Sequence, residues 1–379
     1  MHKEVRTFGT VTRDLLALRD WLAQMGVRHV AMESTGVYWK PIYNILEGEF
    51  EVLLVNARHV KNVPGRKTDV KDCEWLAHLL QCGLLKASFI PPRNQREWRD
   101  LTRTRTQLVR QKAAVANRIQ KVLEDANVKL ASVATDVLGV SGRAMLEALA
   151  SGESDPKALA QMARKRLREK IPQLEAALEG RMSDHHRFLL RALLDQLAHL
   201  EGQIELFEQR IEQLNAPFVH AVEAVAALPG FDTTSASAVV SEIGTDMKAF
   251  PSADHLSSWC GVCPGNHESA GKHQGGQTRK GNAWLRGILT QSAWAATRTK
   301  GSYFQAQYRR LARRRGKKRA LVAVAHSLLV VIYHVLSTGR SFEDLGFDYF
   351  NDREADKIAR HHIRRLEALG YTVTKKDAA

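Results

Sequence analysis

The stretch that decides the fold is Val27-Arg28-His29-Val30-Ala31-Met32-Glu33, an apolar run that ends on a carboxylate. Its length and composition predict a buried β-strand that carries Glu33 to the edge of a sheet. Further along, Asp69 and Asp72 stand three residues apart at the start of a predicted helix, so they share one helix face. Three converging carboxylates repel one another unless a cation lies between them, and hard oxygen ligands suit Mg²⁺. The sequence therefore predicts a magnesium site made by Glu33, Asp69 and Asp72.

Strand and helix patterns alternate through the first ninety residues. We expect strands at 3–9, 27–33 and 51–55, with a helix capped by Thr12 after the first and another over 38–46 after the second. Such alternation predicts an α/β domain with a mostly parallel sheet.

The next segment, 93–215, has a helical pattern with a leucine-rich heptad. Apolar residues repeat at alternating spacings of three and four at Leu190, Leu193, Leu197, Leu200, Ile204, Phe207, Ile211 and Leu214. This periodicity favours a coiled coil that joins protomers into a dimer or tetramer. One helix of an intramolecular bundle is the alternative.

Four domains follow from these patterns: 1–92, an α/β domain; 93–215, a helical linker and coiled coil; 216–350, a mostly helical domain; and 351–379, a basic tail. The third contains Val225-Ala226-Ala227-Leu228-Pro229-Gly230-Phe231, which resembles a helix-hairpin-helix. That motif binds a DNA backbone through loop amides. Asp232 stands where a second glycine is expected, and packing of a small helical domain is the alternative.

The charge balance indicates a nucleic-acid partner. The 379 residues include 56 Lys+Arg against 41 Asp+Glu, a net charge of +15 and a sequence pI near 9.8. No apolar run is predicted to span a membrane and no signal peptide is evident, so we expect a cytoplasmic, nucleoid-associated protein without a membrane partner. Four cysteines fit a reducing compartment; Cys260 and Cys263 have zinc-knuckle spacing, although ordinary packing is favoured.

Basic residues gather in three places where they could bind phosphates. The first group lies beside the acidic residues, the second follows a glycine-rich loop at 264–272, and the third lies in 309–319. Their members are Arg66, Lys67 and Lys71; Lys272, Arg279, Lys280 and Arg286; and Arg313, Arg314, Arg315, Lys317 and Lys318.

The glycine-rich loop also contains Ser269. A serine can attack phosphorus when a base and a metal activate it. A serine that stabilises a turn is the alternative for the loop taken alone.

Four motifs together carry a resemblance to a known family. They are Met32-Glu33-Ser34-Thr35-Gly36-Val37-Tyr38-Trp39, Arg66-Lys67-Thr68-Asp69-Val70-Lys71-Asp72, Leu228-Pro229-Gly230 and Pro264-Gly265-Asn266-His267-Glu268-Ser269-Ala270-Gly271-Lys272. In this order they resemble the bridge-RNA-guided DEDD transposases of the insertion-sequence 110 family, in its 1111-like branch. The likeness covers nearly the whole chain.

This resemblance implies a RuvC-like (RNase H) N-terminal domain, a central coiled coil and a C-terminal transposase domain. Glu33, Asp69 and Asp72 would be the last three of four acidic Mg²⁺ ligands, and Ser269 the nucleophile. A structured non-coding bridge RNA would pair with donor and target DNA, so that base pairing selects the sequence.

One departure concerns the family's first aspartate, which lies on the first strand in an Asp-x-His-Lys motif. This chain begins Met1-His2-Lys3 without it, and Asp14 and Asp20 fall on a predicted helix. We therefore expect an N-terminal domain that lacks its first strands, through a late start or decay of the copy.

The leading hypothesis is an insertion-sequence transposase that cuts and rejoins DNA with Ser269 as nucleophile. The predicted heptad helix spans about 48 Å, so Ser269 is expected to meet the acidic residues of another protomer. The alternatives are a RuvC-like metal-dependent junction resolvase, in which water attacks, and a catalytically inactive nucleic-acid-binding remnant.

Overall fold

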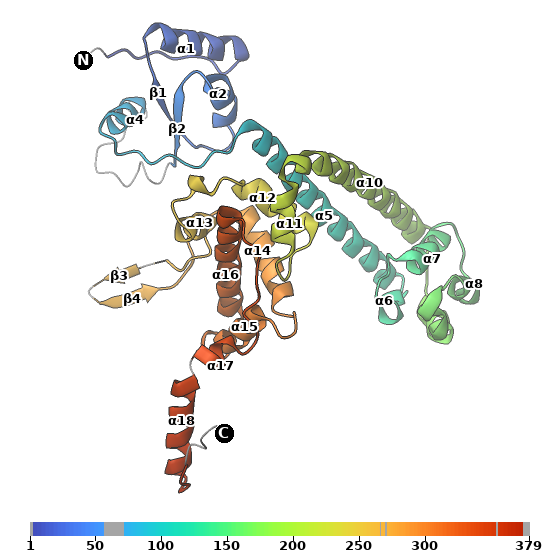
Figure 1. Ribbon diagram of the computed structural model, residues 1–379. Coiled ribbons are helices and arrows are strands. Elements are labelled where there is room, and N and C mark those ends of the chain that lie inside the picture. Colours follow the sequence, from blue (N-terminus) through green and yellow to red (C-terminus); the bar gives the residue numbers. More distant parts are fainter. Residues whose placement is uncertain (1–2, 57–71, 266, 270, 354, 374–379) are drawn as a thin grey trace. The chain divides into compact units, whose positions relative to one another are not determined.

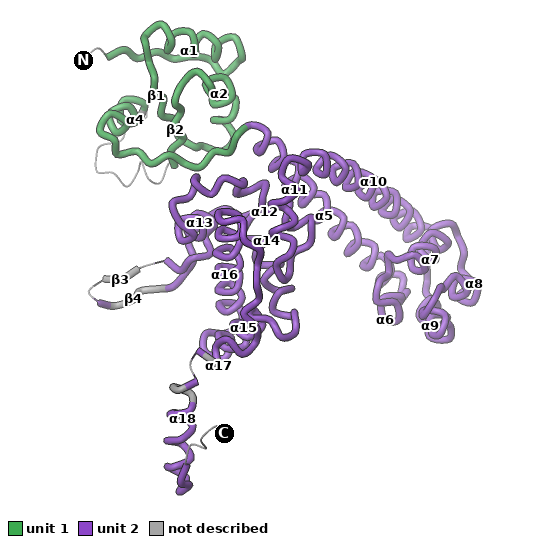
Figure 2. The backbone as a smooth tube through the Cα atoms, in the orientation of Figure 1, with its two compact units in different colours: residues 1–92 green, residues 93–379 purple. Residues whose placement is uncertain are grey.

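The chain folds into two units, residues 1–92 and 93–379 (Figure 2). The structure is a computed structural model that describes residues 3–56, 72–265, 267–269, 271–353 and 355–373. The chain is mostly helical, with two small sheets among these residues (Figure 1).

In the first unit, a short parallel sheet is the framework. Strand β1 (His29–Glu33) pairs with β2 (Glu51–Val55) in a register that sets His29 opposite Glu51 and Glu33 opposite Val55. A parallel pair needs a crossover connection, which here contains α2 (Trp39–Leu46). The other helices of the unit are α1 (Thr12–Gln24) and α4 (Asp72–Gln81). The expected α/β alternation is therefore present on a small scale.

The expected strand at residues 3–9 is wrong, because its described residues pair with no strand. The N-cap of α1 is Val11, whose side chain makes no cap bond, so Thr12 begins the helix and does not cap it. A short segment with Val5 and Phe8 did not suffice here, because a strand also needs a partner that offers it a hydrogen-bonding edge.

A long antiparallel helical hairpin begins the second unit. It joins α5 (Arg93–Asp125) to α10 (Asp184–Asn215), and three ion pairs fix their direction: Arg105 with Glu208, Lys112 with Glu201, and Asp125 with His186. Residue numbers rise along one helix as they fall along the other, which only an antiparallel pair allows.

The heptad stripe of α10 packs inside this one chain. Leu190, Leu197 and Leu200 are buried in the core that α10 forms with α5 and the helices at the end of the hairpin, while Leu194 is buried more deeply than its heptad neighbour Leu193. Within the chain, the stripe therefore packs as one helix of an intramolecular bundle, which was the alternative to a coiled coil. Association of protomers through this region stays a prediction.

Five short elements close the far end of the hairpin and bury their apolar residues in the same core. They are α6 (Leu130–Val133), α7 (Val140–Ala150), α8 (Pro156–Gln161), the 3₁₀ helix η2 (Lys165–Lys170) and α9 (Ile171–Leu178).

The remainder of the unit is a helical domain built around α16. Its elements are η3 (Ala216–Phe218), α11 (Val219–Ala226), α12 (Thr233–Ile243), η4 (Met247–Ala249), α13 (Ala253–Cys260), β3 (His267–Ser269), β4 (Lys272–Gly275), α14 (Ala283–Ala296), α15 (Tyr303–Arg315), α16 (Lys317–Thr338), α17 (Tyr349–Arg353) and α18 (Ala355–Ala368). The helices α11, α13, α14 and α15 all contact α16.

By length and composition alone, α16 could cross a membrane, contrary to the expectation that no run would. It carries the buried side chains Val324, Leu328, Leu329 and Ile332 into the core of this domain. Packing against four neighbouring helices therefore buries part of its apolar surface.

Candidate active site and nucleic-acid surfaces

Glu33 lies at the carboxyl end of β1, next to the end of β2. The backbone N–H of Ser34 donates to the carbonyl of Val55 over 2.9 Å, and the hydroxyl of Thr35 donates to Glu33 Oε1 over 3.3 Å. The sheet therefore delivers this carboxylate to its edge, as the sequence predicts.

The helix that begins at Asp72 packs on the same sheet. α4 contacts β1, and its Leu79 is buried against Val55, with Trp75 and Leu76 alongside. This packing brings the helix that carries Asp72 to the strand that carries Glu33. Asp69, together with Arg66, Lys67 and Lys71, lies outside the described residues.

The donor chemistry of Glu33 fits a hard divalent cation, because it is an oxygen ligand at a sheet edge that is still partly open to solvent. Within the described ranges, no cluster of three His, Cys, Asp or Glu residues could hold a metal ion. The predicted three-carboxylate set thus stays a prediction. The same finding leaves Cys260 and Cys263 without further described ligands for zinc, and Cys260 is buried.

Ser269 is the last residue of strand β3, where it pairs with Lys272, the first residue of β4. The segment is thus a β-hairpin, whereas the sequence indicated an irregular glycine-rich loop. Gly271 in the turn has φ +73°, a left-handed conformation that glycine adopts without strain. Figure 1 shows this hairpin extending away from the helices of its unit.

Two glycines hold the base of the hairpin together. A Cβ on Gly281 would overlap the backbone of Cys260 and Gly261, and one on Gly261 would lie 2.7 Å from the carbonyl oxygen of Arg279. Backbone hydrogen bonds also join the two arms at this base. Gly265 N–H donates to Gln277 O over 2.8 Å, and Asn282 N–H donates to Trp259 O over 3.2 Å. The two arms of the hairpin therefore meet through backbone contacts that tolerate no side chain.

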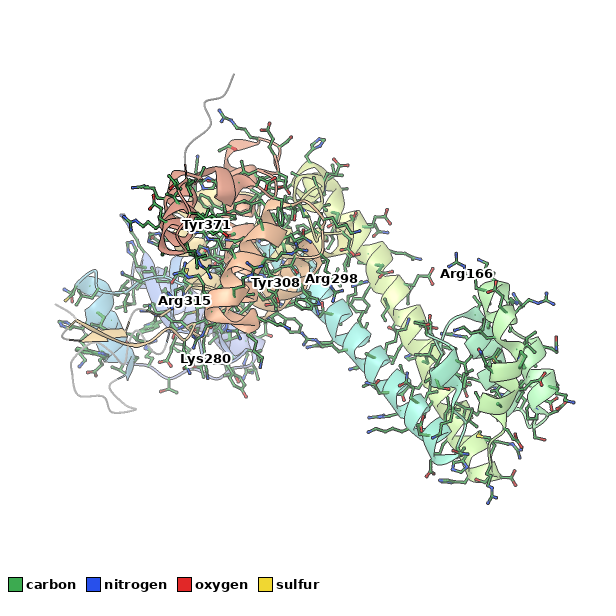
Figure 3. All side chains as sticks on the ribbon, turned by 90° about the horizontal axis from the view of Figure 1, so that it is seen from below. Arg166, Lys280, Arg298, Tyr308, Arg315 and Tyr371 are labelled. Atoms are coloured by element: carbon green, nitrogen blue, oxygen red, sulfur yellow. The ribbon has the colours of Figure 1, made fainter. Side chains whose placement is uncertain are left out.

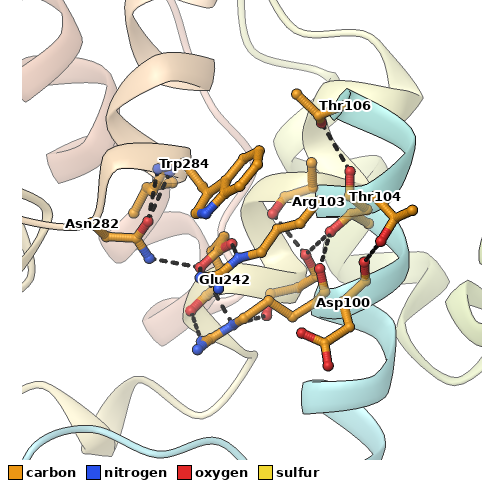
Figure 4. Close-up of polar contacts among 12 residues, drawn as sticks. Asp100, Arg103, Thr104, Thr106, Glu242, Asn282 and Trp284 are labelled. Atoms are coloured by element: carbon orange, nitrogen blue, oxygen red, sulfur yellow. Dashed lines mark hydrogen bonds and ion pairs between the residues drawn. The ribbon is translucent and has the colours of Figure 1, made fainter. Parts of the chain in front are cut away.

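Below this base lies a buried carboxylate, Glu242, whose side chain is 1% exposed (Figure 4). It accepts two hydrogen bonds from Arg103, Nε to Oε1 at 2.6 Å and Nη2 to Oε2 at 2.9 Å. Asn282 Nδ2 donates to Oε2 over 2.6 Å, and Arg99 Nε lies 3.3 Å from the same oxygen. A buried charge is tolerated only when it is paired and hydrogen-bonded in this way.

Asn282 has two functions in this network. Its Oδ1 accepts from the N–H groups of Trp284 and Leu285 over 3.0 and 3.1 Å, so it caps α14 while its Nδ2 binds Glu242. The network therefore fixes α5, α12 and the start of α14 to one another.

The arginines around Glu242 are partly desolvated. Burial lowers the pKa of Arg99 to about 10, although the charge of Glu242 acts in the opposite direction. The guanidinium groups of Arg103 and Arg110 lie over the ring of Trp284, at 5.7 and 5.3 Å from its centre. Such cation–π contacts add to the fixation of α14 against α5.

The segment that resembles a helix-hairpin-helix does join two helices, α11 and α12, through a tight turn at Gly230, which has φ +87°. Asp232 caps α12: its Oδ1 accepts from the N–H of Ser235 over 2.7 Å, and the hydroxyl of Ser235 accepts from the N–H of Asp232. The hydroxyl of Ser235 also donates to Asp232 Oδ1 over 2.6 Å, and this bond, with the one from the Ser235 N–H, holds the pKa of the Asp232 carboxyl below its ordinary value. A charged carboxylate at this helix start disfavours a phosphate there.

Two of the predicted basic residues next to the serine hairpin lie on the surface of the domain. Arg279 and Lys280 are exposed between β4 and α14, Arg286 is half-buried in α14, and Lys272 begins β4. The first two directly precede Gly281 and Asn282, so the Glu242 network positions them.

The third basic group lies at the junction of α15 and α16. Its five members are exposed, and within the described part of the chain none forms an ion pair: Arg313, Arg314, Arg315, Lys317 and Lys318. By contrast, Arg309 and Arg310 lie over the rings of Phe347 and Phe350, at 5.5 and 5.2 Å. The cations earlier in α15 thus pack on aromatic rings, whereas the five of the group remain available to an anionic partner.

Glu242 and Asn282 were missed by the sequence analysis. Glu242 stands in the short apolar segment of α12 with no other charge beside it, which is the one local signal that it is a buried, paired carboxylate. Its partners come from positions up to 143 residues away along the chain, so no spacing rule connects them.

Two models of known protein families match parts of this chain. A family model for the DEDD transposases of IS110, described as "Transposase", matches residues 2–128, and one described as "Transposase IS116/IS110/IS902 family" matches residues 222–309. The first match contains β1 with Glu33, and the second contains the serine hairpin and Asn282.

Three relatives are similar in sequence. A probable family 20 transposase of Pseudomonas aeruginosa is 26% identical over 327 residues, 84% of this chain and 87% of the relative. The transposase for insertion sequence element IS1111A of Coxiella burnetii is 23% identical over 329 residues, 85% of this chain and 81% of the relative. A pilin gene-inverting protein of Moraxella bovis is 26% identical over 155 residues, 39% and 48% of the two chains.

Two separate family matches, one over each candidate site region of the chain, define this protein as a transposase. Transposases act on DNA, which agrees with the net charge of +15. The chain belongs to the IS110 family of insertion-sequence transposases, with relatives that include the IS1111A enzyme.

Proposed function

We propose that this chain is a recombinase that cuts and rejoins DNA strands with Ser269 as its nucleophile. The observation that carries the proposal is the position of Ser269, paired with Lys272 beside the turn of an extended hairpin. A hairpin of this form can insert a hydroxyl against a scissile phosphate. The cations of Arg279 and Lys280 lie beyond its base, where they can bind the flanking backbone.

The proposed chemistry proceeds in two exchanges at phosphorus. The Ser269 oxygen loses its proton and bonds to the phosphorus, while the bond to the 3′ oxygen breaks and that oxygen leaves as a 3′-hydroxyl. A 3′-hydroxyl of another strand then attacks the phosphoserine and releases Ser269. Each exchange conserves the number of phosphodiester bonds, so rejoining needs no external energy source.

Glu33, Asp69 and Asp72 would hold Mg²⁺, which supplies charge stabilisation for the phosphate when bound. Glu33 supports this part of the proposal because the sheet presents its carboxylate at an edge. Arg66, Lys67 and Lys71 are proposed to bind the DNA beside this set. The fourth acidic ligand of the family has no proposed counterpart here.

A structured bridge RNA is proposed to choose the sequences, as the resemblance implies. A protein of this charge can bind the backbones of RNA and DNA while base pairing reads the sequence. The proposed site of action is the cytoplasm, at the nucleoid.

The test combines supercoiled donor DNA, target DNA, RNA and Mg²⁺ with the full chain, followed by denaturing electrophoresis. A covalent protein–DNA adduct is expected, and it should be absent from Ser269→Ala and present in Ser258→Ala, an exposed serine of α13. An adduct that persists in Ser269→Ala would exclude the serine role. Hydrolysed DNA without any adduct would identify the junction resolvase, and binding without cleavage would identify the inactive remnant.

We also propose that a homo-oligomer brings the serine of one protomer to the carboxylates of another. In this case Glu33→Gln and Ser269→Ala, each inactive alone, should restore activity when they are mixed, because one complete site forms between them. Light scattering should give the mass of a dimer or tetramer. A monomeric mass, or no activity in the mixture, would contradict a shared site.

A further inference from the structure

The helical hairpin distributes its cations unevenly. Along its shaft several basic side chains have acidic partners: Arg105 pairs with Glu208, and Lys112 pairs with Glu201, which also pairs with Arg143 of α7. These pairs compensate part of the positive charge of the shaft, and its remaining exposed cations, such as Arg118 and Lys121, are spread along α5.

The far end of the hairpin is different. The segment 164–170, around η2, contains Arg164, Lys165, Arg166, Arg168 and Lys170. All five are exposed, and in the part of the chain that the structure describes none of them forms an ion pair. With only Glu169 among them, five cations in seven residues repel one another, and a polyanion would relieve that repulsion.

Four of these cations, all but Arg168, line a hollow at the end of the hairpin. It has a volume of about 720 Å³ and lies between 164–170 and 133–142. Four cations face two carboxylates there, Asp136 and Glu169, so its net charge is positive. The Asp136 carboxylate already accepts the N–H of Leu138 over 3.0 Å. Figure 3 shows Arg166 at this end, away from Lys280 and Arg315.

The length of α5 sets the distance between the Glu242 network and the far end of the helical hairpin. From Arg99, beside Glu242, to Asp125 at the far end, 26 residues of helix cover roughly 40 Å. One turn of duplex DNA is about 34 Å long. A duplex bound near the serine hairpin could therefore reach the end of the helical hairpin only a full turn or more away from the reacting phosphate.

We propose that 164–170 is a second DNA-binding site, which takes the phosphate backbone of a duplex at this distance. The site lies between the two ranges that match family models, 2–128 and 222–309. The proposal rests on DNA as the substrate but is independent of the serine chemistry.

The test measures binding of the full chain to a 60-base-pair duplex and, separately, to an RNA hairpin, over a range of salt concentrations. Arg164→Glu/Arg166→Glu/Arg168→Glu should weaken duplex binding at least tenfold and reduce the slope of log affinity against log salt by about 2 to 3. Arg166→Glu alone should have a smaller effect in the same direction. Lys157→Glu, an exposed cation of α8 on the same bundle, is the matched control and should change little.

Hydroxyl-radical footprinting should show a protected patch that is lost from the triple variant, while protection nearer the cleavage position remains. Equal duplex affinity for the triple variant and the wild type would overturn the proposal, as would a loss confined to RNA, which would assign the segment to the RNA. Thermal unfolding identifies a variant that misfolds. If the triple variant misfolds, the duplex affinity of Arg166→Glu tests the proposal in its place. Because these readouts need no adduct, failure of the Ser269 proposal would leave them unchanged.

Discussion

Asn282 Nδ2 donates a hydrogen bond to Glu242 Oε2 over 2.6 Å, and this bond joins the base of the serine hairpin to a buried ion pair. Glu242 is at the same time bound to Arg99 and Arg103 from the start of the helical hairpin. Glu242→Gln should therefore leave two partly buried guanidinium groups without a counter-charge. Breaking a buried pair costs about 3 kcal/mol, and we expect a loss of this size in the free energy of unfolding, measured by urea titration with circular dichroism.

Asn282→Ser separates the two functions of the asparagine. Serine keeps an oxygen to cap α14 but offers no amide to Glu242, so the loss should be about 1 kcal/mol. Equal losses for Glu242→Gln and Asn282→Ser would show that the arginine pairing contributes nothing.

Gly281→Ala should disrupt the base of the serine hairpin. Its new Cβ would overlap the backbone of Cys260 and Gly261, which cannot move as a side chain can. Strand joining should fall at least tenfold, while the midpoint of thermal unfolding of the remaining helices moves little. Gly276→Ala is the control, because nothing lies within 4 Å of a Cβ there. The explanation fails if both variants join strands at the same rate.

The cysteines should differ in their reaction with iodoacetamide. Burial raises the pKa of Cys260 to about 12, so almost no thiolate is present at pH 8, and its side chain is inaccessible. Cys73 and Cys82 are exposed and should react first, and Cys263, which is half-buried with a raised pKa, should react more slowly. Mass spectrometry of the native protein measures the order. Early labelling of Cys260 would contradict its buried position.

Acid should weaken the helical hairpin through Glu201. The hydrogen bonds from Arg143 lower the pKa of Glu201 to about 2, and Lys112 contributes further, against an ordinary value of 4.5. A folded-state pKa below the unfolded value means that the stabilisation is complete above about pH 4.5. It is lost as the pH falls toward 2.

The wild type should therefore unfold at a higher temperature than Glu201→Gln at pH 6, and the difference should disappear near pH 2. Circular dichroism at a series of pH values measures this difference. A gap that stays constant between pH 6 and pH 2 would mean that the carboxylate charge is irrelevant.

The exposed cations at the junction of α15 and α16 should contribute to binding of nucleic acid. Arg313→Ala/Arg314→Ala/Arg315→Ala should reduce the salt dependence of duplex binding by about 0.9 per phosphate contact that is lost. Filter binding at several salt concentrations gives the slope. Arg340→Ala removes an exposed cation beyond α16 and controls for the loss of net charge. If it changes the slope as much per charge removed, the three arginines contribute only through the net charge of the protein.

The sequence by itself determined the features that depend on local patterns. An apolar run followed by Glu33 sufficed to predict a strand that ends on a carboxylate, because a buried strand needs little more than β-prone residues and a break. Heptad spacing identified a long helix with an apolar stripe. The order of four motifs indicated the transposase family.

Only the tertiary structure decided which surfaces meet. The leucine stripe of α10 packs against α5 of the same chain, and a heptad cannot tell this partner from a second protomer. The residues after Pro264 form a hairpin because Gly261 and Gly281 let two backbones touch, a contact between positions twenty residues apart. Glu242 acquires Arg103 and Asn282 through folding alone, since charge pairing in a core depends on distance in space and sequence separation does not encode it.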